Sequence, residues 1–308
     1  MTTAEQIISQ LLDRNSPVAA RMRSIFSLKG LATPQAVQAL EKSLVTDPSA
    51  LVRHEVAYVL GQMRAIQSLP TLTKVLENAA EDVMVRHEAA EAMGAIAHNS
   101  VLPLLDRYAA DASLAREIRE TCVLAVNRIR WYQHQTTPAQ APYTSVDPAP
   151  PEQGKDVSQL QDLLCDASKP IFERYKAMFA LRNIGGEQAV LALCAGMDAE
   201  KESALFRHEV AYVLGQMQHS ASVPTLARFL KDQQEHEMVR HEAAEALGSI
   251  ASPQAEKILD QFRADEKDVV RESVEVALDI SDYISGDHLH YAQKINGASN
   301  TTSLQATR

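Results

Sequence analysis

The chain of 308 residues carries the tripeptide Arg-His-Glu four times, and the spacing of these copies constrains the fold more than any other feature. The copies begin at Arg53, Arg86, Arg207 and Arg240, so the members of each pair lie 33 residues apart and the pairs are offset by 154. The flanking sequence repeats as well, since VRHEVAYVLGQM at 52–63 returns as FRHEVAYVLGQM at 206–217. A period of this length is typical of stacked helical repeats, and the longer offset indicates a duplicated half.

Eight arginines mark the register of the repeats. They lie 31 to 33 residues apart within each half, and each is followed seven residues later by an apolar residue, at Arg21, Arg53, Arg86, Arg119, Arg174, Arg207, Arg240 and Arg271. The intervening segments supply a second helix per repeat, as at 70–79 and 224–233, which both open with proline. The pattern predicts an all-α solenoid of eight helical hairpins in two halves of four, with the arginines as interhelical ion pairs or caps.

Composition predicts the boundaries between the halves. The first half covers residues 1–133 and the second covers residues 157–285. Residues 134–156 are rich in Pro, Ala, Thr and Gln, which predicts a flexible linker and not a packed helix. Residues 286–308 are expected to form a polar tail.

Charge and cysteine content narrow the class of protein. A formal net charge of −10 opposes binding to nucleic acid, whose phosphates require a basic surface, and favours a cationic partner. The sequence has no apolar run of about 18 residues, so we expect no membrane span. The N-terminus does not resemble a secretory signal. The three cysteines are widely spaced, which argues against disulfides or a thiolate metal site. We expect a cytoplasmic protein that binds neither nucleic acid nor membrane.

The inner repeats differ from the outer ones at the two positions after the register arginine. These positions are His-Glu in the four inner repeats, whereas the outer repeats have Met22-Arg23, Glu120-Thr121, Tyr175-Lys176 and Glu272-Ser273. The hairpin scaffold therefore does not itself require His-Glu. Ordinary hydrogen-bonded His–Glu pairs would not explain this restriction, so we interpret the motifs as a functional site.

The eight motif residues are candidate metal ligands, namely His54, Glu55, His87, Glu88, His208, Glu209, His241 and Glu242. Equivalent positions in adjacent repeats face the same way, which predicts one cluster around His54 and His87 and a second around His208 and His241. Successive helix residues diverge by about 100°, so the His and Glu of one motif are not expected to point at the same metal. One Glu per half could therefore face a substrate instead.

Imidazole and carboxylate ligands without thiolate leave iron, manganese or catalytic zinc as the metal. The remaining histidines break the register and are expected on the surface or in loops, at His98, His134, His219, His236, His288 and His290.

These features resemble the deoxyhypusine hydroxylase family, whose members are di-iron monooxygenases built from eight HEAT-like repeats. The resemblance covers residues 5–285 and is most specific in LVRHEVAYVLGQM, DVMVRHEAAEAMGAI, YKAMFALRNIGGEQAVLAL, SALFRHEVAYVLGQM and MVRHEAAEALGSIAS. It implies hydroxylation of the deoxyhypusine side chain on the hypusine-bearing translation initiation factor, in the cytoplasm, with O₂ and two Fe(II) per chain. It also implies iron ligands at His54, His87, Glu88, His208, His241 and Glu242, with Glu55 and Glu209 as further ligands or as groups that orient the amine.

Two other classes of function remain open from the residues alone. A metal-free HEAT-repeat binding scaffold or lyase-like protein would share the repeats but would not need His-Glu at inner positions. A metal-dependent hydrolase could use the same ligands with zinc or manganese. The identity of the bound metal would separate these alternatives.

Overall fold

The computed structural model describes residues 2–133 and 142–286, and within these ranges it contains sixteen α-helices and no strand. The helices of the first half are α1 (Thr3–Leu12), α2 (Val18–Leu31), α3 (Pro34–Thr46), α4 (Ala50–Gln62), α5 (Leu69–Glu77), α6 (Val83–Ile96), α7 (Leu102–Ala110) and α8 (Arg116–Gln133). Those of the second half are α9 (Val157–Cys165), α10 (Ile171–Ile184), α11 (Gly186–Ala199), α12 (Ala204–Met217), α13 (Val223–Lys231), α14 (Glu237–Ile250), α15 (Pro253–Leu259) and α16 (Asp268–Ser285). The predicted all-α fold of eight hairpins is confirmed.

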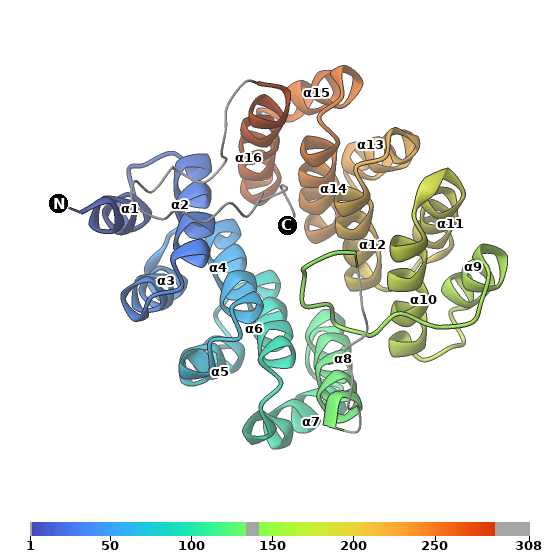
Figure 1. Ribbon diagram of the computed structural model, residues 1–308, viewed down its shortest axis with the longest axis horizontal. Coiled ribbons are helices and arrows are strands. Elements are labelled where there is room, and N and C mark those ends of the chain that lie inside the picture. Colours follow the sequence, from blue (N-terminus) through green and yellow to red (C-terminus); the bar gives the residue numbers. More distant parts are fainter. Residues whose placement is uncertain (1, 134–141, 287–308) are drawn as a thin grey trace.

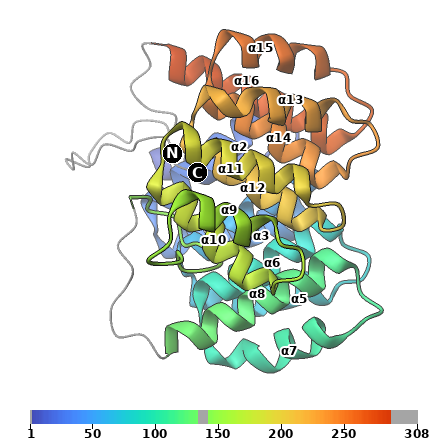
Figure 2. The same cartoon turned by 90° about the vertical axis from the view of Figure 1, so that its right-hand side faces the viewer.

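The hairpins form a closed ring. Figure 1 shows the even-numbered helices on the inside of the ring and the odd-numbered helices on the outside. Figure 2 shows from the side how the hairpins stack from α7 and α8 up to α15 and α16. The ring closes because α16 packs against α2 and α4, while α8 packs against α10 and α12. The inner helices of the two halves therefore face one another across a common centre.

Matched contacts hold the two halves together at their junctions. The Ser49 hydroxyl, which caps α4, donates to the Glu272 carboxylate on α16 at 2.6 Å. The Ser203 hydroxyl, which caps α12, donates to the Glu120 carboxylate on α8, also at 2.6 Å. Glu120 and Glu272 each follow a register arginine in the last repeat of their half. The halves thus meet through equivalent residues at both junctions.

Small residues let the inner helices approach closely. Gly61, eight positions after its register arginine, lies so near α6 that a Cβ atom there would be 2.7 Å from the Ala92 Cα. The corresponding Gly248 on α14 is even closer, because an added Cβ would lie 2.5 Å from the Ala277 Cα on α16. Such spacing requires glycine, since a real Cβ essentially never comes within 3.0 Å of another heavy atom. The close approach brings the motif side chains of neighbouring helices within reach of each other.

Most register arginines that precede another repeat in the same half form an ion pair, as predicted. Five of them form ion pairs with an acidic residue just before the following inner helix, in the pairs Arg21–Asp47, Arg53–Glu81, Arg174–Glu200, Arg207–Glu235 and Arg240–Asp265. Most of these pairs are buried, which makes them sensitive to loss of either partner. These ion pairs tie an inner helix to the segment before the next inner helix, and so help to set the stacking of the hairpins.

The described part of the predicted linker is held by both halves. Residues 134–141 lie outside the described residues, and residues 142–156 form no helix. The Val146 amide donates to Gln62 Oε1 of the first half at 2.7 Å, and Asp147 forms an ion pair with Arg182 of the second half at 2.6 Å. The flexible segment expected over 134–156 is thus anchored at its centre, because a buried arginine recruits Asp147. Of the predicted tail, residues 287–308 lie outside the described residues.

Candidate metal centre

All four motif histidines meet at the centre of the ring. His54 and His87 have ring centroids 5.4 Å apart, and His208 and His241 have centroids 5.2 Å apart. The distances between halves are just as short, at 5.4 Å from His54 to His241 and 5.5 Å from His87 to His208. The two predicted clusters are therefore one group of four imidazoles, because ring closure brings α4 and α6 opposite α12 and α14.

Glu88 and Glu242 join this group in equivalent ways. Glu88 Oε2 lies 3.3 Å from His54 Nε2, and Glu242 Oε2 lies 3.4 Å from His208 Nε2. His54, His87 and Glu88 each offer a ligand atom, and these atoms lie within 4.8 Å of one another. The His and Glu of one motif were not expected to point at the same metal, yet His87 and Glu88 offer ligand atoms to one group, since the carboxylate reaches back toward the neighbouring helix.

Glu55 and Glu209 are placed differently from the other two carboxylates. Both side chains are buried. Among the residues that the structure describes, the groups that could hold a metal ion do not include either of them. They follow His54 and His208 directly, so they flank the imidazoles without joining a ligand group.

Burial among like charges raises the pKa of several carboxyl groups. The pKa of Glu88 is raised to about 8, mainly because burial disfavours the charged form, with a further contribution from Glu55 and Glu242. The pKa of Glu209 is raised well above its ordinary range by burial and by the neighbouring carboxylates of Glu91 and Glu88. The centre therefore has the electrostatic character of a site that would be stabilised by bound cations.

The donor set fits a transition-metal site. His87 is fully buried, and neither of its ring nitrogens has a hydrogen-bond partner among the described residues. Burying an unsatisfied polar group costs free energy, so such an imidazole indicates a missing ligand. Its pKa is held well below the ordinary value by burial and by the nearby His54 and His208, which favours the neutral form that binds metals. Imidazole with carboxylate is the combination that non-haem iron uses.

A pair of tyrosines spans the two halves beside the histidines. Tyr58 and Tyr212 lie one helical turn after His54 and His208, and their hydroxyl oxygens are 2.9 Å apart. Gln216 Nε2 donates to the Tyr212 hydroxyl at 2.9 Å and to Ser145 Oγ of the linker at 3.2 Å. The tyrosine pair and the linker therefore cover the centre on the side toward the C-termini of α4 and α12.

Sequence reasoning missed the carboxylates one turn after the second motif of each half. Glu91 follows His87 by four residues, and Glu245 follows His241 by four. Glu245 Oε1 lies 3.7 Å from His241 Nδ1. The spacing of four residues, which places side chains on one face of a helix, was the available signal.

The other histidines serve the local structure of the chain. His98, His219 and His236 accept hydrogen bonds from backbone amides at the starts of helical segments. His134, His288 and His290 lie outside the described residues. The expectation of surface or loop positions is thus met by the three that are described, which cap helices.

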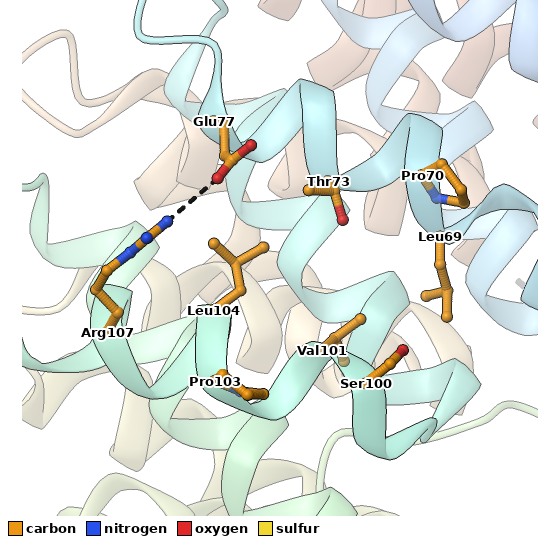
Figure 3. Close-up of a pocket in the computed structure, with 9 residues that line it drawn as sticks. All are labelled: Leu69, Pro70, Thr73, Glu77, Ser100, Val101, Pro103, Leu104 and Arg107. Atoms are coloured by element: carbon orange, nitrogen blue, oxygen red, sulfur yellow. Dashed lines mark hydrogen bonds and ion pairs between the residues drawn. The ribbon is translucent and has the colours of Figure 1, made fainter.

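The larger surface hollows lie away from the histidines. One hollow of about 460 Å³ lies between the outer helices α5 and α7 and is lined by residues that include Leu69, Thr73, Leu104 and Arg107 (Figure 3). Arg107 and Glu77 form an exposed ion pair across its edge at 3.2 Å. A second hollow lies between α13 and α15. None of the residues that line these two hollows belongs to the His-Glu motifs.

Comparison with known protein families and structures places these features in context. Sequences described as HEAT repeats match residues 4–84, 47–127 and 190–279, and a PBS lyase HEAT-like repeat matches residues 173–199. Deoxyhypusine hydroxylase of Gallus gallus is 50% identical over 296 residues, covering 95% of this chain and 97% of the relative. Deoxyhypusine hydroxylases of Homo sapiens and Drosophila melanogaster are 49% and 47% identical, each covering 94% of this chain and 95% and 94% of the relative.

A solved structure of human deoxyhypusine hydroxylase in complex with glycerol matches with a TM-score of 0.87 and 50% identity, covering 91% of this chain and 96% of the human chain. Within residues 2–133 and 142–286, no helix is long and apolar enough to cross a bilayer.

Proposed function

Because the chain belongs to the deoxyhypusine hydroxylase family, we propose that it hydroxylates the deoxyhypusine side chain of a protein substrate, using O₂ and two Fe(II) ions per chain. The substrate that we propose is the hypusine-bearing translation initiation factor, in the cytoplasm. The observation that carries the proposal is the convergence of four buried imidazoles and two carboxylates from both halves. No nucleic acid or membrane is part of the proposal, since the chain is acidic.

We assign the ligands by half. His54, His87 and Glu88 would hold one iron, and His208, His241 and Glu242 would hold the other. Two histidines and one carboxylate with open positions are the ligand set of non-haem Fe(II) oxygenases, which use O₂ to insert oxygen into a C–H bond. The eight motif residues are at most 5% exposed, and such burial keeps electrostatic interactions between them strong.

Glu55 and Glu209 would bind the amines of the substrate. The deoxyhypusine side chain is a long cationic amine, and these two carboxylates are buried beside the histidines but outside the ligand groups. A cation that enters the centre would restore the charged form of Glu209, whose pKa burial and neighbouring carboxylates now raise. Charge-assisted hydrogen bonds to the amines would fix the position of the side chain against the metal ions.

Metal analysis joined to a turnover assay tests this function. Protein loaded anaerobically with Fe(II) should retain about two irons per chain, as two 2-His-1-carboxylate sites require. When O₂ and a reductant that supplies two electrons per turnover are then added, it should convert deoxyhypusine to hypusine on the intact factor, with the second oxygen atom leaving as water. Retention of zinc or manganese with no hydroxylation would instead support a hydrolase. Failure to retain any metal would support a binding scaffold and refute the proposal.

Glutamine variants test the role of Glu55 and Glu209. Glu55→Gln and Glu209→Gln should weaken binding of the deoxyhypusine-bearing factor or its turnover more than they lower iron content. His54→Ala is the matched comparison, since it removes a proposed ligand from the adjacent position. If the glutamine variants lose iron to the same extent as His54→Ala, the two carboxylates are ligands and the amine-binding role is wrong.

A further inference from the structure

We propose that Glu245 is a positioning residue that fixes the orientation of His241, and that it makes the two metal sites inequivalent. The inference rests on the metal centre of the proposed function, and it adds a difference between the two halves that the repeated motifs do not suggest.

In the second half, His241 is supported from the side of Nδ1. Ser273 on α16 donates a hydrogen bond to Glu245 Oε1 at 3.1 Å, and the same hydroxyl lies 3.5 Å from His241 Nδ1. Glu245 Oε1 lies 3.7 Å from that nitrogen. Glu245 and Ser273 are 1% and 0% exposed, so water does not compete for these contacts. The three side chains form a buried network that ends on the imidazole.

This arrangement has a known chemical consequence for a metal-binding histidine. An acceptor beside one ring nitrogen holds the proton there, which leaves the other nitrogen with its lone pair for the metal and fixes the plane of the ring. The buried carboxylate also raises the basicity of the imidazole. Glu245 also offers a ligand atom within 4.8 Å of those of His241 and Glu242. Its Oε1 accepts a hydrogen bond from Ser273 and lies on the Nδ1 side of His241, so we assign it to that side of the ring. There it would strengthen the bond from His241 Nε2 to a metal without itself touching the ion.

The first half has the same helices but a different environment. Thr121 occupies the position equivalent to Ser273, and its hydroxyl instead donates to the Glu117 carbonyl one turn earlier on α8, at 2.8 Å. Neither ring nitrogen of His87 has a hydrogen-bond partner within the described part of the chain. Among these residues, His87, the equivalent of His241, therefore has no such network beside its ring.

The linker and one arginine explain why Glu91 does not take the role of Glu245. Glu91 faces a small hollow that is also lined by Arg128 on α8 and by Val146 of the linker. Arg128 Nε donates to the Asp147 carbonyl at 2.7 Å, which holds the linker against this half. The position equivalent to Arg128 in the second half is Ile280, which cannot hold a linker segment as Arg128 does. Glu91 is therefore turned toward the linker and Glu245 toward the histidine.

Titration with Co(II) tests the inference, because cobalt reports its ligand field by absorption and does not require turnover. The wild-type protein should bind two Co(II) per chain in two steps of different affinity. Glu245→Gln should weaken the tighter step by roughly 10- to 100-fold, the usual effect of removing such a partner, and should shift its absorption bands. Glu91→Gln, the matched control in the first half, should change either step by less than about 3-fold, well below that effect.

Ser273→Ala tests the same network with a smaller change. It keeps the inference testable if Glu245→Gln does not fold. It should weaken the same step, whereas Thr121→Ala should not. If Glu245→Gln and Glu91→Gln changed cobalt affinity equally, or if Glu245→Gln did not change it, this inference would be overturned but the proposed function would not. Loss of one Co(II) even at saturation in Glu245→Gln would make Glu245 a ligand, and would overturn it too. Wild-type protein that binds no cobalt would overturn the proposed function as well.

Discussion

Raising the pH from 6.5 to 8 should destabilise the metal-free protein, and Glu88 is the residue with which to test this. Burial raises the pKa of Glu88 to about 8 in the folded chain, against an ordinary value of 4.5. Between these values the folded protein holds a proton that the unfolded chain has released. The free energy of unfolding therefore falls as the pH rises through this range and becomes constant above it.

Between pH 6.5 and 8, the contribution of the buried carboxyl groups to the free energy of unfolding can be separated from that of His87. The pKa of His87 is lowered well below 6.5, so its contribution to the free energy of unfolding rises with pH only up to about that value. Above it, Glu88 alone should lower the free energy of unfolding by about 1.5 kcal/mol, since each pH unit corresponds to about 1.4 kcal/mol and titration is half complete at pH 8. Glu91, with a pKa also raised to about 8, contributes in the same window.

The assay compares the wild-type protein with Glu88→Gln. This substitution removes the titration of Glu88 and also lowers the pKa of Glu91 and Glu209, because the Glu88 carboxylate helps to raise both. Urea unfolding in the presence of a chelator, at pH 6.5 and pH 8, gives the change in free energy of unfolding for each protein. The fall in free energy of unfolding from pH 6.5 to pH 8 should therefore be smaller in Glu88→Gln by at least about 1.5 kcal/mol. Saturating metal should abolish the loss in the wild-type protein, because the ligand is then already charged. Identical changes in both proteins would refute the reasoning.

Two further predictions follow from the site and from the packing. His54→Ala should lower iron content measured by elemental analysis, whereas His98→Ala should not, because His98 caps a helical turn outside the centre; equal loss would contradict the assignment. Gly248→Ala should lower the free energy of unfolding by about 1–3 kcal/mol in urea titrations, because its Cβ would meet the α16 backbone at 2.5 Å. Gly30→Ala, where nothing lies within 4 Å, should be neutral or stabilising, and a similar loss there would contradict the packing argument.

Much of the fold could be predicted from the sequence, because the repeat is local. The spacing of the register arginines indicated the number of hairpins, and ion pairs such as Arg240–Asp265 follow directly from it. Closure of the ring could not be predicted in this way. It depends on contacts between residues more than two hundred positions apart, such as Ser49 with Glu272, which leave no periodic signal.

The candidate site was predicted by residue but not by arrangement. Comparison of inner with outer repeats singled out the four His-Glu motifs, since the scaffold does not need them. The merging of two clusters into one follows from ring closure, so it was not visible in either half. The roles of Glu245 and Ser273 were hidden for another reason, because Thr121 and Ser273 are chemically similar and only their hydrogen bonds differ.

The matched junctions, Ser49 with Glu272 and Ser203 with Glu120, have the form of an isologous interface, the kind that identical subunits make in a two-fold dimer. The chain is in this sense a dimer whose subunits have been joined end to end. In a dimer of identical subunits, every substitution would appear beside both pairs of histidines. Joining the subunits removes that constraint, so that the surroundings of the two histidine pairs can diverge, as the hydrogen bonds of Ser273 and Thr121 already do.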